Sequence, residues 1–524
     1  MANQDWTAGY VSDLGYTHGF YGELTPQRLT YCALNAGQLS FNPAGTFRFC
    51  ELGCGQGFSA NLLASANPHG EFVATDFNPS QVAGARRLAD EAGLSNIRFY
   101  DTPFASFVDE PSLPAEFDVI ALHGIYSWIS SQNRAAIVDF IARKLRVGGL
   151  VYISYNALPG YSAAAPLRHL MYLHGKSQGG PTMGRLEAAL GFTERMLGCN
   201  AAFFRANPGL KERFDQIKHR DRAYLAHEYF NDHWELFYHS DVARDLASAK
   251  LTFAVSAALL ETVDIINLTA EQSAILAEIT DPVQRETAKD FMLNQNFRRD
   301  IFVKGPLPQS QRILQQHWME QRFALSTPRA DVASVVRGAL GQANLQADVY
   351  DPLLDGLMHG PRTLGQLMEA DAVMELGWAR LMQALTILVG LGHLQPCLPL
   401  EGEEARAQST RAFNRAVMER ARDSGDLAFL ASPVTGGGVQ VDRMVQLFLL
   451  ALENGRQDPA GWADFAADII LLQGQRLLKD GKPIEDLDAN RAELLTRARA
   501  FAEALLPLLR QLKVSRTEGT AVAI

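Results

Sequence analysis

The stretch that decides the fold runs from Phe47 to Phe58, FRFCELGCGQGF. FRFCEL is short, apolar and aromatic, which predicts a strand, and SANLLASAN after the loop has the composition of a helix. Between the two lies GCGQG, a GxGxG pattern that Glu51 precedes. Glycines at this place allow a sharp turn and let a ligand lie against bare main chain. The stretch therefore predicts a strand, a ligand-binding loop and a helix.

The same alternation continues as far as residue 160. Strand-like and helical stretches follow one another in the order EFVATDF, SQVAGARRLADEAG, NIRFYD, FDVIALHG, RAAIVDFIARKLRVGG and LVYISYNALPG. Strands separated by helices are typical of successive βαβ units. We therefore predict an α/β fold with a Rossmann-like, doubly wound and mostly parallel sheet. Right-handed crossovers place the carboxyl ends of its strands at one edge, where ligands bind.

Beyond residue 160 the pattern becomes helical, with two later strand-like stretches. LTFAVSAALLE (251–261) and FRRDIFVKG (297–305) predict strands that return to the sheet as a hairpin. GPLPQSQ (305–311) is typical of a linker, and the pieces between 345 and 400 resemble a winged-helix or helix-turn-helix module. We expect a Rossmann-like, cofactor-binding core at 1–165 and a helical regulatory or lid segment at 166–305, which contains the returning strands. A winged-helix-like module at 312–402 and a helical module at 403–524 are expected to follow.

Composition narrows the class of protein. The chain has 524 residues and a formal charge of −10, from 58 acidic and 48 basic residues. Its 47% hydrophobic and 20% charged residues are typical of ordinary globular proteins. Sequence-independent binding to nucleic acid depends on neutralised phosphates, so this balance disfavours a nucleic-acid partner. No apolar run approaches the roughly 18 residues that a membrane span needs, and we expect no membrane insertion.

Cysteine and histidine patterns predict neither disulfides nor a metal site. The five cysteines are odd in number and form no CxxC pair, which favours a reducing compartment. The N-terminus lacks the pattern of a secretory signal, and we expect a cytoplasmic location. His227 and Glu228 begin like the zinc motif HExxH, but Asn231 stands where the second histidine is needed. We therefore predict no metal.

The loop and the next strand together indicate the kind of cofactor. Asp76 ends EFVATD, and an acid at that place can accept hydrogen bonds from both hydroxyls of a ribose. A dinucleotide fingerprint is GxGxxG, whereas the spacing here is GxGxG. Glu51 would repel a pyrophosphate but tolerates the ammonium of a methionine group. The pattern favours S-adenosylmethionine, and the alternative is a Rossmann-like domain that binds NAD or no cofactor.

These motifs resemble a known family. ELGCGQG, ATDFNP, FDVIALHGIYSWI and GGLVYISYNALPGY are similar to class I S-adenosylmethionine-dependent methyltransferases. More narrowly they resemble the bacterial group with a methyltransferase regulatory domain, which includes lysine methyltransferases of outer-membrane proteins. YTHGFYGELTPQRL (16–29) is similar to that group's N-terminal cap, YLAHEYFNDHWELFY (224–238) and FRRDIFVKG to its regulatory segment, and residues 345–400 to its winged-helix-like module.

The resemblance implies a set of cofactor-binding residues. In the first loop these are Glu51, Gly53, Cys54, Gly55 and Gly57, with the acid and the glycines around the methionine part of the cofactor. Asp76 is expected to bind the ribose hydroxyls, and Asn78 to steady the same loop. Asp101, or Thr102 beside it, is expected to face the adenine amino group. His123, after the fourth strand, is expected beside the methyl group.

Candidate catalytic residues follow the fourth and fifth strands. They are His123, Tyr126 and Asn156. His123 is equally suited to cap the next helix, and Tyr126 and Trp128 to ordinary packing under the loop. Asn156 lies in NALPG, which resembles the (N/D)PP(Y/F) loop of amino-group methyltransferases but differs from it in position and order.

Two aromatic segments can cover the site. Tyr16, Phe20 and Tyr21 resemble the family's lid over the cofactor, or they form a clip that holds the N-terminal segment. Tyr229, Phe230 and Trp234 can cap the site or pack between helices.

Three functions fit the sequence. The first is a protein-lysine N-methyltransferase whose C-terminal half recruits a polypeptide, such as an outer-membrane or cell-envelope protein. The second is a small-molecule, lipid or glycan methyltransferase with a helical lid. The third is a catalytically silent regulator that binds the cofactor. The acceptor, N- versus O-methylation, the number of methyl groups and the oligomeric state are left open by the residues.

Overall fold

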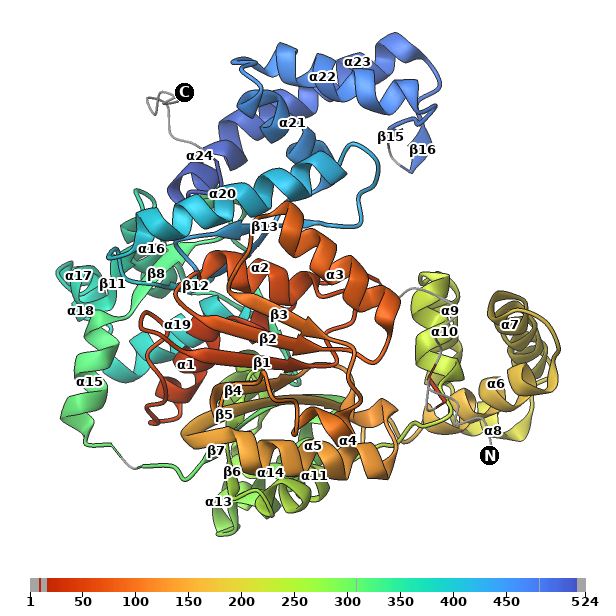
Figure 1. The fold of residues 1–524 in the computed structure, drawn as a ribbon. Coiled ribbons are helices and arrows are strands. Elements are labelled where there is room, and N and C mark those ends of the chain that lie inside the picture. The colour runs from red at the N-terminus through yellow and green to blue at the C-terminus, as the bar shows by residue number, and fades with distance from the viewer. Residues whose placement is uncertain (1–8, 11–16, 308, 480, 516–524) are drawn as a thin grey trace.

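The computed structural model describes residues 9–10, 17–307, 309–479 and 481–515. A seven-stranded sheet lies at its centre in the order β3-β2-β1-β4-β5-β7-β6 (Figure 1). Its strands are β1 (Arg48–Leu52), β2 (Glu71–Thr75), β3 (Ile97–Tyr100), β4 (Phe117–Leu122), β5 (Leu145–Asn156), β6 (Leu251–Ser256) and β7 (Phe297–Lys304). The first five are parallel, and β7 and β6 add antiparallel at one edge. This confirms the predicted Rossmann-like, mostly parallel sheet.

Helices cover both faces of the sheet because apolar side chains alternate along each strand. In β1, Phe49 belongs to one hydrophobic cluster and its neighbour Cys50 to another, as the two-residue period of a strand requires. One face packs on α1 (Pro26–Asn35), α2 (Phe58–Ala66) and α3 (Pro79–Glu91). The other packs on α4 (Phe104–Phe107), α5 (Ser131–Lys144) and α11 (His239–Ala247). The sheet is therefore buried on both sides.

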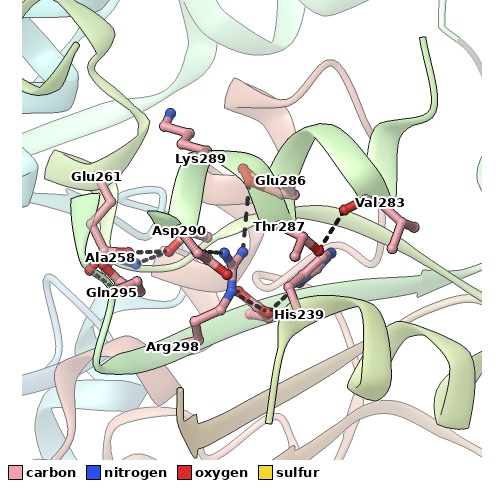
Figure 2. Close-up of polar contacts among 12 residues, drawn as sticks. His239, Ala258, Glu261, Val283, Glu286, Thr287, Lys289, Asp290, Gln295 and Arg298 are labelled. Atoms are coloured by element: carbon pink, nitrogen blue, oxygen red, sulfur yellow. Dashed lines mark hydrogen bonds and ion pairs between the residues drawn. The ribbon is translucent and has the colours of Figure 1, made fainter. Parts of the chain in front are cut away.

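The antiparallel edge of the sheet contains a buried network of charges. Arg298 on β7 donates from Nε to Asp300 at 2.9 and 3.0 Å and pairs with Asp290 of α14 (Pro282–Leu293). Figure 2 shows Arg298, Asp290 and Glu286 pointing toward one another. Tyr155 of β5 donates its hydroxyl hydrogen to Asp300 at 2.6 Å. Although burial raises the pKa of Asp300, Arg298 and His239 hold it well below its usual range. Through Tyr155 the network fixes the end of β5, which leads into the site.

A separate group of helices stands beside the carboxyl ends of the parallel strands (Figure 1). We call residues 165–230 the helical cap. It consists of α6 (Ala165–Ser177), α7 (Thr182–Gly198), α8 (Ala202–Ala206), α9 (Gly209–Lys218) and α10 (Arg222–Phe230). These helices share their own hydrophobic cluster, which includes Met171, Leu186, Phe214 and Leu225. The cap is thus held together by a hydrophobic cluster of its own.

Between β6 and β7 and beyond them, the chain forms short helices and small sheets. The remaining elements up to Cys397 are α12 (Asp264–Asn267), α13 (Ala270–Glu278), α15 (Gln311–Glu320), β8 (Arg322–Leu325), β9 (Val335–Gly338), β10 (Gly341–Asn344), α16 (Ala347–Gly356), β11 (Arg362–Thr363), α17 (Leu364–Leu367), α18 (Asp371–Met374), α19 (Trp378–Gly390) and β12 (Leu394–Cys397). Strands β11, β8 and β12 form a three-stranded antiparallel sheet.

The C-terminal part packs onto the face of the sheet that α2 and α3 cover (Figure 1). Its elements are α20 (Glu403–Arg420), β13 (Phe429–Ser432), β14 (Gly437–Gln440), α21 (Arg443–Glu453), α22 (Pro459–Leu472), β15 (Leu478–Lys479), β16 (Lys482–Pro483), α23 (Leu487–Ala500) and α24 (Leu506–Gln511). Phe413 of α20 lies 6.1 Å from Phe58 of α2, between ring centroids. One hydrophobic cluster runs from α1 through α24. The predicted division at 312 and 403 stays a prediction.

Among the described residues, neither a membrane-spanning helix nor a metal-binding cluster is present. Across the described part of the chain, no helix combines the length and apolarity needed to cross a membrane. The same residues contain no group of three or more histidine, cysteine or acidic side chains placed to hold a metal ion.

Candidate active site

A cavity of about 560 Å³ lies at the carboxyl ends of the parallel strands. Its lining comes from the N-terminal segment, the loops after β1, β2 and β4, residues of α4, β5 and β7, and the helical cap with the segment before it. We call residues 51–57 the glycine loop. The volume is that of an ordinary small-molecule site, and its position is the one that the sheet topology predicts.

The glycine loop needs its glycines for two reasons. Gly53, Gly55 and Gly57 all have positive φ, at 75°, 53° and 65°, a region that other residues rarely adopt. In addition, a Cβ on Gly53 would lie 2.6 Å from Cγ2 of Ile125, and one on Gly57 would lie 2.5 Å from Cβ of Ala85. The backbone therefore approaches its neighbours as closely as possible and exposes its main chain to the cavity.

Two buried carboxylates frame the glycine loop. Asp76, directly after β2, accepts hydrogen bonds from the backbone N–H groups of Gly55 at 2.9 Å and Asn78 at 3.0 Å. Burial raises its pKa to about 6 in spite of these bonds. Burial, with a smaller contribution from Asp76, raises the pKa of Glu51 to about 8. Within the described residues, Oε2 of Glu51 is buried without a hydrogen-bond partner. An ammonium group of a ligand is a suitable partner for that oxygen.

His123 follows β4 and lines the cavity. Its ring stacks on Tyr21 with the centroids 3.7 Å apart, and its Nδ1 lies 2.9 Å from the hydroxyl of Tyr152. Burial lowers the pKa of His123 to about 4, which Glu23 opposes and Arg299 reinforces. The imidazole is therefore neutral at physiological pH. Tyr21 lines the same cavity, and its role as a lid stays a prediction.

Asn156 ends β5 and also lines the cavity. Its backbone N–H donates to Oγ of Ser127 at 2.9 Å, and register pairing with Phe297 of β7 fixes its position. The Nδ2 atom of Asn156 is buried and has no hydrogen-bond partner among the residues described. Its side-chain amide is therefore available to a ligand in the cavity.

Four predicted residues do not line the cavity. Tyr126 is fully buried, and its hydroxyl donates to Asp245 at 3.0 Å on the other side of the loop. Asn78 caps α3, with its side-chain oxygen accepting from the N–H of Ser80. Asp101 and Thr102 follow the end of β3, and Asp101 is exposed. These placements favour packing and capping roles for Tyr126 and Asn78, and the adenine contact of Asp101 or Thr102 stays a prediction.

Most of the aromatic residues expected to cover the site pack elsewhere or lie outside the described residues. Tyr16 lies outside the described residues. Phe20 packs on Phe429 of β13, with ring centroids 5.2 Å apart, and so holds the N-terminal segment to the C-terminal part. Phe230 is buried in the helical cap's own cluster, and Trp234, which follows the cap, packs edge-on against Tyr161.

Several lining residues were not predicted from the sequence. On the cofactor side they include Phe77 and Gln81, which follow Asp76, and Phe104 of α4. The helical cap and the segment before it contribute Tyr161, Arg213, Arg220, Tyr224 and Glu228. Nearness to Asp76 in the sequence was a signal for Phe77 and Gln81. The second group is brought to the site by tertiary packing alone.

The fold and the site together define a class. A mostly parallel Rossmann-like sheet, a positive-φ glycine loop and two buried acids at the strand ends are the arrangement of a class I S-adenosylmethionine-dependent methyltransferase. S-adenosylmethionine fits the site for two reasons. The free oxygen of Glu51 suits its ammonium group, and the glycine loop has no basic side chain that would bind a phosphate.

Comparison with known proteins defines the family more closely. A methyltransferase-domain model matches residues 45–176, and the model of a predicted methyltransferase regulatory domain matches residues 221–304. The uncharacterized protein sll1526 of Synechocystis is 43% identical over 510 residues, which cover 97% of this chain and all of the relative. The chain therefore belongs to the methyltransferase family that carries this regulatory domain, and it is an S-adenosylmethionine-dependent enzyme.

More distant proteins share the sequence in part or only the fold. Protein RP789 of Rickettsia prowazekii is 26% identical over 266 residues, or 50% of this chain and 46% of the relative. The structure of PKMT2 from Rickettsia typhi in complex with AdoHcy superposes with a TM-score of 0.67 at 18% identity, covering 93% of this chain and 98% of that one. The fold shared with PKMT2 extends through the C-terminal half.

Proposed function

We propose that this methyltransferase transfers methyl groups to lysine side chains of a polypeptide that its C-terminal half helps to recruit. The observation that carries the proposal is the extent of the fold shared with PKMT2, which includes the C-terminal half as well as the methyltransferase core. A small acceptor would not need the large surface of α15–α24. The resemblance to outer-membrane-protein lysine methyltransferases supports a cell-envelope polypeptide as the substrate class.

The residues of the site have distinct tasks in this reaction. When bound, the cofactor supplies an electrophilic methyl group on a sulfonium. Glu51 would hold its ammonium group, the glycine loop its methionine part, and Asp76 its ribose hydroxyls. The neutral ring of His123, held between Tyr21 and Tyr152, would form the wall beside the reacting atoms. These groups act mainly by position and charge, which is where such enzymes gain most of their rate.

The acceptor must lose a proton before it can react. A lysine with its ordinary pKa of about 10.4 pays roughly 4 kcal/mol to be neutral near pH 7.5. The cavity lowers that cost because burial among aromatic rings disfavours the charged form. Tyr10, Trp128, Tyr161 and Tyr224 all line it.

A transfer experiment tests the proposal. The protein is incubated with S-adenosylmethionine carrying a tritiated methyl group and with a cell-envelope fraction, and the products are separated by size and hydrolysed. We expect label in protein bands, recovered as methyl-lysine, and none with Asp76→Ala. Label confined to lipids or small molecules would contradict protein methylation while leaving the enzyme class intact.

A second acceptor class has one observation in its favour. Arg213 and Arg220 also line the cavity, and their guanidinium groups suit a carboxylate or another anion on a small molecule. The same experiment separates the two, since label would then appear only in the low-mass fraction.

Two finer assignments belong to this proposal. Strands β11, β8 and β12 with the helices between them support a winged-helix-like module that docks protein rather than nucleic acid, as the acidic balance of the chain suggests. The cytoplasmic location stays a prediction that the free cysteines support.

A further inference from the structure

The part of the cavity that the helical cap lines contains a carboxylate, Glu228, to which the expected cofactor contacts assign no role. Glu228 lies near the end of α10, one helical turn after Tyr224, so both side chains lie on the same face of the helix. Both line the cavity, together with Tyr161 and Tyr10. A single acid of the helical cap is therefore placed among aromatic rings, in the same cavity as the residues that would bind the cofactor.

Two cations, Arg168 and Arg220, act on Glu228 by charge but make other contacts with their guanidinium groups. Arg168 of α6 donates to the backbone oxygens of Glu228 at 3.1 Å and Asn231 at 3.0 Å, and its guanidinium lies 4.6 Å from the ring centroid of Trp234. Arg220 lies over the ring of Tyr224, 6.0 Å from its centroid. In the part of the chain that the structure describes, the carboxylate of Glu228 has no hydrogen bond and no ion pair within 4.0 Å.

We propose that Glu228 is the residue that binds the ammonium group of the acceptor lysine and takes its proton. This role rests on the proposed function, and it would explain why the acceptor is an amine. The tyrosine rings would surround the methylene stem of the lysine and present their π-faces to its charge. The carboxylate would supply the one negative charge in this part of the cavity.

The chemical step balances without a further reactant. One N–H bond of the ammonium breaks, and its proton goes to the carboxylate of Glu228. The nitrogen lone pair that this releases forms the new N–C bond to the methyl carbon. The S–C bond breaks at the same time and its electron pair stays on the sulfur, which leaves S-adenosylhomocysteine and a methylammonium product. Glu228 then returns its proton to water.

The charge state of Glu228 suits this task. Burial raises its pKa to about 7, while Arg168 and Arg220 lower it by less. The groups that interact with its carboxylate are Tyr10, Tyr161, Arg168, Arg220, Tyr224 and Tyr229. The pKa values of these tyrosines are raised above 10, so Glu228 alone among them changes charge near neutrality. Such a base is ionised above pH 7 and accepts a proton most effectively there.

The pH dependence of methyl transfer distinguishes a base from a structural residue. With Glu228 as base, the rate at saturating cofactor should rise to about pH 7 and then level off. In Glu228→Gln the acceptor must lose its proton to water, so the rate should keep rising toward the ordinary lysine pKa of about 10.4. At pH 7 we expect about a 100-fold loss of kcat/KM, the low end for removal of a general base, and a much smaller loss at pH 10.

The test uses the full chain and the polypeptide band labelled by the wild type in the envelope fraction. Glu212→Gln, on the exposed face of α9, is the matched control and should behave as the wild type. Cofactor binding by calorimetry should be the same in all three proteins, which also reports folding. If Glu228→Gln does not fold, Glu228→Asp should keep the plateau above pH 7 at a lower rate.

The outcomes distinguish the role of Glu228 from the proposed lysine methylation. If the wild type labels protein and Glu228→Gln keeps both its rate and its plateau, or Glu228→Asp loses the plateau, the role of Glu228 is overturned and the function stands. If the wild type labels no protein although it binds the cofactor, the proposed function fails, and this inference fails with it.

Discussion

The two walls of the cavity are built by different means. The glycine loop is held by its main chain: Gly53 and Cys54 donate their N–H groups to the carbonyl of Thr75 at 2.8 and 3.0 Å. The wall formed by the helical cap consists of side chains on helices that pack in a cluster of their own. A wall of main chain tolerates few substitutions, whereas a wall of side chains can be changed one residue at a time. Changes in the first wall should therefore affect the cofactor, and changes in the second only the acceptor.

The largest effect is expected where the loop backbone is most confined. In Gly57→Ala the new Cβ meets Ala85 and Phe99 at 2.5 and 2.8 Å, and φ is 65°. We expect a loss of about 2–4 kcal/mol in stability, from positive-φ strain and overpacking together, and loss of measurable cofactor binding. Thermal unfolding and calorimetry check the two effects.

The control for Gly57 has the same backbone conformation without the crowding. Gly93 has φ of 64°, and nothing lies within 4 Å of where its Cβ would be. Gly93→Ala should lose only about 1 kcal/mol, the cost of strain alone, and should bind the cofactor normally. Equal losses in the two variants would show that crowding at Gly57 is unimportant.

The second prediction concerns the carboxylate of the first wall. Asp76→Ala removes the acceptor expected for the ribose hydroxyls and a hydrogen bond to the N–H of Gly55. Charged hydrogen bonds contribute about 1.5–3 kcal/mol each, so cofactor affinity should fall about 100-fold in calorimetry. Asp101→Ala, on an exposed side chain beyond β3, should change it little. A large loss in Asp101→Ala would restore the predicted adenine contact.

The same contrast explains what the sequence could predict. Strands β1 to β5 and the glycine loop were predictable because each depends on a local apolar run and on glycines whose φ values only glycine readily adopts. The late hairpin β6–β7 was also visible as two apolar stretches. Glu51, Asp76, His123 and Asn156 then follow from topology, because they lie at or next to the ends of neighbouring strands and so meet at one edge.

The rest depends on packing that no local pattern specifies. Glu228 and Tyr224 reach the cavity only because the helical cap stands against the carboxyl edge of the sheet. Tyr126 follows a strand end as a site residue should, but the turn at Tyr126–Trp128 directs its hydroxyl to Asp245 of α11. Asp101 and Thr102 were placed by analogy, and β3 ends one residue before them.

The third prediction uses the raised pKa of Glu51. With a pKa of about 8, its carboxyl is protonated at pH 7, and the ammonium group of the cofactor should ionise it on binding. Affinity should therefore rise about tenfold between pH 6 and pH 7, as linkage requires when binding releases one proton. Calorimetry in buffers of different ionisation enthalpy should detect that proton.

Glu51→Gln provides the control for the proton release. It should bind the cofactor more weakly and should lose the part of the pH dependence that comes from this carboxyl. If the variant releases as many protons as the wild type, another group, such as Asp76 with its pKa of about 6, is responsible.

The smallest effect is expected on the second wall, and it is the sharpest test of the comparison. Tyr224→Leu removes one aromatic ring from the acceptor side but leaves the glycine loop untouched. An exposed cation–π contact contributes about 0.5–1 kcal/mol, so the KM for the polypeptide acceptor should rise about threefold while the Kd for the cofactor stays the same. Phe203→Leu, on α8 and 37% exposed, should change neither. If Tyr224→Leu weakened the cofactor as much as the acceptor, the two walls would be one site, and the helical cap would have to be counted among the cofactor's own contacts.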